Sequence, residues 1–371
     1  MSTSSHNSTT NNDLPAKVTA CVTGASGFLG AAVAICFLDL GHAVRLPLRK
    51  EEQARAWREK YGERYEGRIE TVLLEKTMEK EGAFDEAVKG CDVVVHAASP
   101  AIFEIKTTPE EEVFKPAING TLSILRSAHN AGTVKSVVIT SSDSAYCSVL
   151  GKMHLGPEDT LSDASWNPIT YEEAVKMDKT EGEEIYSASK TLAEKAAWDF
   201  VKDPSVRFKL CTLGPSCVIG YNPSPLVKTL KDVRSSVAIT AGALWDKQEF
   251  PPHNLKTFRP ECFVPIASVA EAHVLAALHP SRSGGKRFLL VGHRSSLERL
   301  VREMIKAQPA LKEHLPPLPE KEGEGEGPKG QYKVEANRVE KELGFEYQPW
   351  SDCIKEFAEQ ICVLAKAGGQ L

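Results

Sequence analysis

A glycine-punctuated turn near the start of the chain constrains its fold more than any other feature. The apolar segment 17–21 is typical of a short strand, glycines follow at Gly24, Gly27 and Gly30, and Gly41 ends the apolar helix that opens there. Gly24 permits a tight turn, Gly27 lets a phosphate approach the backbone, and Gly30 allows close helix–strand packing. N–H groups at the start of such a helix attract anions. A purely structural turn is the alternative, but its position between strand and helix favours a dinucleotide-binding turn.

The strand after this turn indicates which dinucleotide binds. An NAD site places a carboxylate about twenty residues further on, where it holds the ribose 2′-hydroxyl. No carboxylate occurs between Gly41 and Lys50, and Leu48 stands where one is expected, directly before Arg49. Arginine can grip a 2′-phosphate with two hydrogen bonds. The alternative is that Arg49 and Lys50 merely begin a solvated, charged helix. We expect the cofactor to be NADPH.

Apolar strands and helical patterns alternate through the first part of the chain. Strands are expected at 69–74, 93–97, 136–141 and 208–213. Helices are expected at 83–89 and 109–129, and a third helix, which carries Tyr186, is expected to end at about residue 202. Continuous apolar strands separated by helices predict a parallel sheet covered on both faces. Right-handed crossovers then give a doubly wound α/β fold of the Rossmann type.

The composition of the sequence changes past residue 215, where proline and glycine become frequent and the alternation of strand and helix patterns stops. We expect a disordered Ser/Thr/Asn-rich tail at 1–14, a dinucleotide-binding domain at 15–215, and a smaller, mostly substrate-facing α+β domain at 216–371. Within the latter, 263–285 is expected to return to the Rossmann domain. The acidic, glycine-rich segment 320–330 is expected to be a flexible loop.

Composition excludes several other classes of protein. The 371-residue chain has a net charge of −5 and no basic patch interleaved with aromatics, so a nucleic-acid partner is not expected. No apolar stretch approaches the length of a membrane span. Nine scattered cysteines without a C-x-x-C motif indicate reduced thiols, a cytoplasmic location and no structural metal. The expected state is a monomer or a weak homodimer.

A tyrosine and a lysine four residues apart supply the candidate chemistry. Tyr186 and Lys190 share one face of the expected helix. Hydride arriving at a carbonyl carbon leaves an alkoxide that must be protonated. A free phenol has a pKa of about 10, and a nearby lysine cation and an oxidised nicotinamide should lower it. Lys190 would also hold the nicotinamide ribose. Ser142, at the end of the preceding strand, would donate to the substrate oxygen; Ser141 is the alternative, because adjacent strand side chains point oppositely.

These motifs together resemble the extended short-chain dehydrogenase/reductase superfamily. The segments 82–100, 115–122, 166–174 and 186–200 are similar to the dihydroflavonol reductase-like branch and to the fungal NADPH-dependent aldehyde and ketone reductases of the methylglyoxal type. The resemblance spans about 17–364 and is strongest before Gly220. It implies that Ser142, Tyr186 and Lys190 are catalytic and that Arg49 contacts the 2′-phosphate.

The remaining candidate residues follow from the same pattern. Those expected to contact the cofactor lie in the turn, after the neighbouring strands and on the catalytic helix: Gly24, Ser26, Gly27, Phe28, Leu29, Gly30, Arg49, Lys50, Ala97, Ala98, Ser99, Tyr186, Lys190 and Pro215. Those expected to line the substrate pocket follow strand ends: Ile102, Phe103, Asp143, Tyr146 and Tyr221. His96 and His273 are expected to be hydrogen-bonded core histidines, and Cys147 and Cys217 small buried side chains.

Three departures from the family pattern bear on the cofactor and the pocket. Thr77 or its neighbours stand where the family has an acidic residue, Ala267 and Ser268 replace an Arg-Asp pair, and Gly214 replaces a polar residue. Asn119 lies one helix position away from the register of the catalytic asparagine of other short-chain reductases, and we do not count it.

Two further functions are open at this point. Asp143 stands where sugar-nucleotide dehydratases carry a Thr-Asp-Glu run, and it could act as an acid in a dehydratase or epimerase, although Ser144 replaces the glutamate. A non-catalytic NADP-binding sensor is the other, but it would have no need of Tyr186. We expect a reductase that takes hydride from NADPH to a small or medium apolar aldehyde or ketone, in a secondary-metabolite pathway, with Tyr186 as proton donor.

Overall fold

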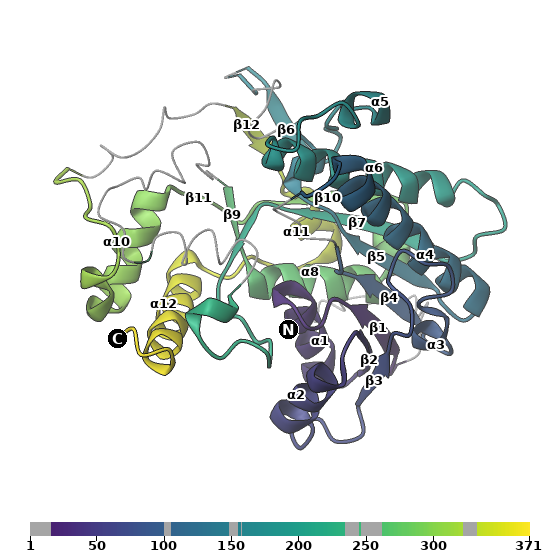
Figure 1. The fold of residues 1–371 in the computed structure, drawn as a ribbon, viewed down its shortest axis with the longest axis horizontal. Coiled ribbons are helices and arrows are strands. Elements are labelled where there is room, and N and C mark those ends of the chain that lie inside the picture. The colour runs from purple at the N-terminus through teal and green to yellow at the C-terminus, as the bar shows by residue number, and fades with distance from the viewer. Residues whose placement is uncertain are drawn as a thin grey trace, which may run out of the picture.

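A seven-stranded parallel sheet forms the centre of the computed structural model, which describes residues 16–99, 105–147, 155–156, 158–233, 245, 262–321 and 332–371. The strand order is β10-β7-β5-β4-β1-β2-β3 (Figure 1). The strands are β1 (Thr19–Thr23), β2 (Ala43–Leu48), β3 (Ile69–Leu73), β4 (Val93–His96), β5 (Ser136–Thr140), β7 (Lys209–Pro215) and β10 (Lys286–Leu290). The chain adds β2 and β3 on one side of β1 and then adds β4, β5, β7 and β10 on the other side. The strand order therefore reverses between β1 and β4, which is where doubly wound folds bind ligands. The predicted fold class is confirmed.

Helices cover both faces of this sheet. One face carries α1 (Phe28–Asp39), α2 (Glu51–Tyr61) and α8 (Ile266–Leu278), and the other carries α3 (Asp85–Val88), α4 (Lys115–Ala131) and α6 (Gly182–Phe200). Strand alternation divides the core between the faces: Val93 and Val95 pack with α1 and α8, whereas Val94 packs with α3 and α4. Both faces of the strands are therefore apolar, as predicted.

The helix expected at 109–129 begins differently from the prediction. Residues Glu110–Phe114 form a π-helical turn, η1, in which the Lys115 N–H bonds the Glu110 carbonyl, and α4 follows it. Pro116 has no N–H to continue the ordinary i→i−4 pattern, which accounts for the irregular turn. The helix expected at 83–89 is shorter, at Asp85–Val88.

The later part of the chain returns to the sheet over a longer stretch than the 263–285 expected. After α8, the short helix α9 (Pro280–Ser283) leads into β10, which pairs with β7. A second, three-stranded sheet joins β11 (His293–Arg294), β9 (Cys262–Pro265) and β8 (Cys217–Ile219), and β12 (Lys333–Glu335) pairs with β6 (Thr160–Ser162).

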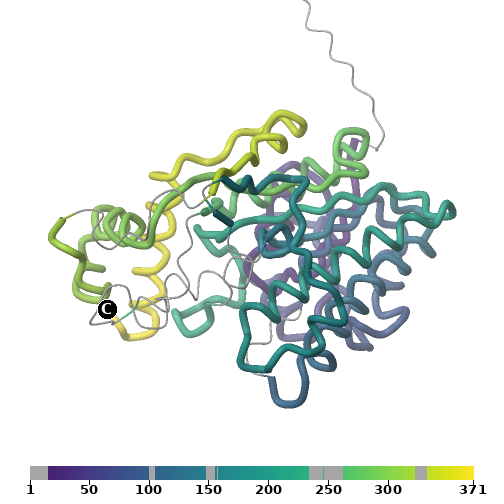
Figure 2. The backbone as a smooth tube through the Cα atoms, turned by 90° about the horizontal axis from the view of Figure 1, so that it is seen from above, coloured from purple at the N-terminus to yellow at the C-terminus, as the bar shows by residue number. Residues whose placement is uncertain are grey.

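The helices α10 (Leu297–Ala307) and α12 (Trp350–Ala367) lie to one side of the main sheet in both views (Figures 1 and 2). There α10 packs on α12, whose stripe Ile354, Phe357, Ile361 and Leu364 is buried, as expected of core packing. The other elements are short: η2 (Asp143–Ala145), α5 (Tyr171–Ala174), η3 (Leu230–Asp232), η6 (Pro309–Glu313) and α11 (Arg338–Leu343). Within the described ranges, no helix is long and apolar enough to cross a bilayer.

Candidate active site

The glycine turn fits tightly against the end of β4. Gly24 has φ +76°, and a Cβ atom there would lie 2.9 Å from the Ala97 carbonyl carbon and from the Ala98 nitrogen. A Cβ atom on Gly30 would lie 2.4 Å from the Gly24 carbonyl group, so this glycine is required by the turn itself. At Gly27 a Cβ atom would meet only the Gly24 oxygen, at 3.3 Å, and no side chain caps the start of α1. Among the residues that the structure describes, no side chain accepts from the N–H groups of the first helical turn.

Thr23 and His96 tie the ends of β1 and β4 together. The Ala98 N–H donates to the Thr23 hydroxyl over 3.1 Å, and that hydroxyl lies 2.9 Å from His96 Nδ1. Burial, reinforced by the charge of Lys190, lowers the pKa of His96 to about 3. His96 is thus neutral, and its Nδ1 shares a hydrogen bond with the Thr23 hydroxyl. It is a hydrogen-bonded core histidine, as expected, although it also borders the pocket described below.

The cationic pair lies where β2 leads into α2. Arg49 and Lys50 are exposed, and Lys50 Nζ is 3.3 Å from Glu52. The Arg49 N–H donates to Gln53 Oε1 over 3.0 Å, which holds the first turn of α2 in place. The Arg49 guanidinium makes no hydrogen bond or ion pair with the part of the chain that the structure describes. It is therefore available to a ligand at this edge.

The two serines after β5 point to different partners. The Ser141 hydroxyl donates to Glu194 Oε2 over 2.6 Å. The Ser142 hydroxyl donates to Asp143 Oδ1 over 3.0 Å and accepts from the Ser144 N–H over 3.3 Å. The side chain of Ser142 also makes a hydrogen bond with the side chain of Tyr186. Since the Ser141 hydroxyl is hydrogen-bonded to Glu194, Ser142 is the serine that faces the Tyr186 phenol.

Tyr186 and Lys190 lie one turn apart on α6, with Lys190 Nζ 5.9 Å from the centroid of the Tyr186 ring. Burial raises the pKa of Tyr186 to about 12; the Ser142 hydroxyl opposes this rise and Asp143 adds to it. Burial lowers the pKa of Lys190 to about 8, against the attraction of Glu194. Burial is thus the largest influence on the phenol pKa in this structure, and the lowering expected from Lys190 together with an oxidised nicotinamide stays a prediction.

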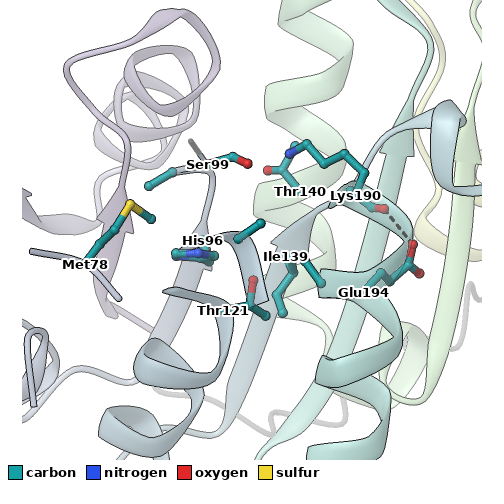
Figure 3. Close-up of a pocket in the computed structure, with 12 residues that line it drawn as sticks. Met78, His96, Ser99, Thr121, Ile139, Thr140, Lys190 and Glu194 are labelled. Carbon is teal, nitrogen blue, oxygen red and sulfur yellow. Dashed lines mark hydrogen bonds between the residues drawn. The ribbon is translucent and has the colours of Figure 1, made fainter. Parts of the chain in front are cut away.

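A pocket opens on the α4 and α6 side of this site (Figure 3). It joins the loop after β4 to the catalytic helix, and Ser99 and Lys190 point toward one another across it. Its lining consists of Met78, His96, Ala98, Ser99, Ala117, Thr121, Ile139, Thr140, Ser141, Lys190, Ala193 and Glu194. Asn119, which we did not count, is not part of it. Three residues that we predicted to bind the cofactor, Ala98, Ser99 and Lys190, thus share one pocket.

Tyr146 lies in the core, although we expected it in the substrate pocket. Its ring is 1% exposed, and a Cβ atom on Gly214 would lie 2.2 Å from its Cε2 atom. The ring of Tyr146 therefore fills the space that a side chain at residue 214 would need, which accounts for the departure from the family pattern there. Tyr221 is 45% exposed beyond β8, and Asp143 adjoins Ser142. The candidates Ile102 and Phe103 lie outside the described residues.

The thiols behave as expected of buried side chains. All nine cysteines are free. Cys147 is buried and Cys217 half-buried, and burial, with Asp143 nearby, raises the pKa of both thiols. His273 is likewise the predicted core histidine, since Val269 O and Thr140 Oγ1 lie 2.7 and 2.8 Å from its two ring nitrogens.

The other departures are also accommodated by local contacts. The Ser268 hydroxyl accepts from the Gln348 N–H over 2.8 Å, and Ala267 is exposed on α8. Thr77 donates to Glu79 over 2.6 Å, and the neighbouring Met78 turns into the pocket.

Glu194, which was not among the residues predicted from the sequence, joins the site from the next turn of α6. Its carboxylate touches Ser141 and pairs with Arg287, whose Nε lies 2.6 Å away on β10. One signal was present in the sequence: Glu194 follows Lys190 by four residues, so it continues the face that carries Tyr186 and Lys190. The partner Arg287 had no such signal.

Comparison with known proteins assigns the family. Residues 20–292 match the NAD dependent epimerase/dehydratase family. The chain belongs to that family. Among its relatives, a cinnamoyl-CoA reductase of Medicago truncatula is 32% identical over 343 residues, which are 92% of this chain and 94% of the relative. A ketoreductase of Aspergillus niger is 31% identical over 339 residues, covering 90% and 94%.

Solved structures agree with this assignment. The crystal structure of yeast methylglyoxal/isovaleraldehyde reductase complexed with NADPH aligns with a TM-score of 0.80 at 26% identity, and it covers 95% of this chain and 100% of that one. The resemblance inferred from the motifs is thereby confirmed. This member of the epimerase/dehydratase family is similar to the reductases within it.

Proposed function

We propose that this family member is an oxidoreductase that uses NADPH to reduce the carbonyl of a small or medium apolar aldehyde or ketone. The observation that carries the proposal is the meeting of Ser142, Tyr186 and Lys190 beside the glycine turn, at the carboxyl edge of the sheet. Reductases dominate the similar proteins, and the aligned yeast reductase was solved with NADPH.

The residues around the turn fit NADPH. The uncapped N–H groups at the start of α1 and the space left by Gly27 suit a pyrophosphate. Arg49 has a free guanidinium for the 2′-phosphate, with Lys50 beside it. Ser99 and Lys190 face each other where ribose hydroxyls would be held. When bound there, NADPH supplies the hydride, and the protein orients it.

Proton transfer falls to Tyr186. Because its pKa is raised to about 12, the phenol is protonated at neutral pH and can donate to the oxygen of the reduced carbonyl. Ser142 hydrogen-bonds the same oxygen and so stabilises the charge that develops on it. Lys190, when charged, stabilises the phenolate that remains after the transfer. The charge of Asp143 adds to the rise of the phenol pKa, so it helps keep Tyr186 protonated at neutral pH.

A screen of NADPH oxidation across aliphatic aldehydes, diketones, flavanonols and aromatic ketones tests the proposal. We expect at least one carbonyl class to be reduced, with one NADPH consumed for each alcohol formed. Product that forms without loss of NADPH would identify a dehydratase or epimerase instead. Binding of NADPH with no turnover of any carbonyl would favour a sensor.

A further inference from the structure

A buried carboxylate behind the catalytic residues joins four elements of the fold. The side chain of Glu194 is 1% exposed. It accepts hydrogen bonds from Ser141, directly after β5, at 2.6 Å, from Thr212 of β7 at 2.7 Å, from Trp198 of its own helix at 3.2 Å and from Arg287 of β10 at 2.6 Å. A carboxylate this deeply buried is stable only when its oxygens are satisfied, and these donors satisfy them.

Its partner Arg287 is held as firmly. The guanidinium is 10% exposed and lies between two aromatic rings, 4.0 Å from the centroid of Tyr146 and 3.5 Å from that of Trp166. It also donates to the carbonyls of Asp163, at 3.1 Å, and Ser165, at 2.8 Å. A buried ion pair is weak evidence for net stability, so we ask what other role this pair has.

The position of Glu194 relative to the site supplies that role. It touches Ser141, the residue before Ser142, and it lies one helical turn after Lys190, in the wall of the same pocket. The dashed line in Figure 3 marks the hydrogen bond that Glu194 accepts from Ser141. One carboxylate therefore contacts the strand end that carries the serine and extends the helix face that carries the lysine.

We propose that Glu194 is a positioning residue for the reduction: through Ser141 it holds the strand end that carries Ser142 against α6, the helix that carries Tyr186 and Lys190. This inference rests on the proposed function. The titratable and polar groups described around Lys190 are Tyr186 and Glu194 on α6, His96 on β4, Ser99 after β4, and the hydroxyls of Thr140 and Ser141 at the end of β5. His96 is neutral, because its pKa is about 3. Glu194 is thus the group whose charge favours the ammonium, with Arg287 on its far side.

Glu194→Gln is the first test, because the amide keeps the shape and can still accept from Ser141 while losing the charge. We expect kcat for carbonyl reduction to fall about 10- to 100-fold, the size of effect that misplacement of a catalytic group produces. The alkaline limb of the kcat–pH profile should move to lower pH, since Lys190 would lose its proton earlier. A purely structural residue would not move that limb.

Two further variants separate positioning from folding. Ser141→Ala leaves the ion pair intact and removes only the link to the strand end, so kcat should fall without a shift of the alkaline limb. The double variant Glu194→Gln/Arg287→Met removes both buried charges and covers the case in which Glu194→Gln alone does not fold. Because the lost Arg287 cation partly offsets the lost carboxylate, it should show a smaller shift in the same direction.

The matched control is Glu298→Gln on α10. Glu298 is also 1% exposed and also bonds an arginine, with Arg302 at 2.7 Å, but it lies in the C-terminal helix pair. The Glu298→Gln variant should have a lower free energy of unfolding than wild type but an unchanged kcat and pH profile.

The pH dependence of NADPH affinity, measured by fluorescence, provides a readout that needs no turnover. In Glu194→Gln or the double variant, the midpoint of that dependence should move to lower pH. If wild type binds NADPH but reduces no carbonyl, a moved midpoint would still support the charge role of Glu194 while the proposed function failed. Unmoved midpoints, together with wild-type kcat in Ser141→Ala, would overturn the inference.

Discussion

Substituting Gly214 by alanine tests whether the Tyr146 ring occupies the space that a side chain would need there. A Cβ atom at Gly214 would lie 2.2 Å from Cε2 of Tyr146 and 2.9 Å from its Cζ. Nonbonded carbon atoms pack about 3.5–4.0 Å apart, so the overlap exceeds about 1 Å. The ring has little room to withdraw, because it is 1% exposed and the Arg287 guanidinium lies 4.0 Å from its centroid.

Overfilling a packed core costs about 1–3 kcal/mol, and an overlap of this size belongs at the upper end. We therefore expect Gly214→Ala to lower the free energy of unfolding by about 3 kcal/mol. Urea denaturation followed by circular dichroism measures this directly. Gly182→Ala is the matched control, since a Cβ atom on Gly182 would meet nothing within 4 Å and the residue starts α6. That variant should be as stable as wild type or slightly more stable.

A double-mutant cycle with Tyr146→Leu isolates the contact. Removing the ring should cost stability alone but should relieve the clash in Gly214→Ala, so the double variant should be more stable than the sum of the single effects by about 1–3 kcal/mol. Additive effects, or a Gly214→Ala variant as stable as wild type, would refute the assignment of that space to Tyr146.

Three further predictions concern the reaction. Arg49→Glu should weaken NADPH binding by roughly ten- to a hundredfold while affecting NADH less, because a charge-assisted phosphate contact is lost; fluorescence titration of both cofactors measures this, and equal affinities of wild type for the two would contradict it. The reduction rate should decline as pH rises above about 8, where Lys190 loses its proton, and a flat profile to pH 10 would assign the titration elsewhere. Asp143→Asn should change reduction only modestly and should move the pH dependence of alcohol oxidation to lower pH, since the carboxylate that raises the Tyr186 pKa is gone; a loss of roughly 10²- to 10⁴-fold would instead identify Asp143 as an essential acid.

The parts of the site that the sequence predicted are those set by local pattern. The spacing of Gly24 and Gly30 reflects backbone contacts within one turn, and the edge at which Ser142 lies follows from strand direction alone. The choice between Ser141 and Ser142 stayed open, because it depends on which hydroxyl a distant carboxylate takes. Glu194 takes Ser141, and only the folded structure reveals this.

Contacts between distant segments account for the rest. Arg287 reaches Glu194 across 93 residues of sequence, so no local pattern announces the pair. Tyr146 follows a strand end, as a pocket residue would, yet it is buried because Gly214 leaves room for its ring. The direction of the Tyr186 pKa shift depends on burial, which the spacing of Tyr186 and Lys190 does not encode.

Tyr186→Phe tests the central claim most directly, because it removes one hydroxyl and leaves the ring in place. The measurement is NADPH affinity together with NADPH loss per alcohol formed, in this variant and in wild type. We predict that Tyr186→Phe binds NADPH nearly as well as wild type but no longer reduces the carbonyl. Lys190→Ala should be impaired both in NADPH binding and in carbonyl reduction. Turnover by Tyr186→Phe at the wild-type rate on any reduced substrate would contradict the assignment of the proton donor.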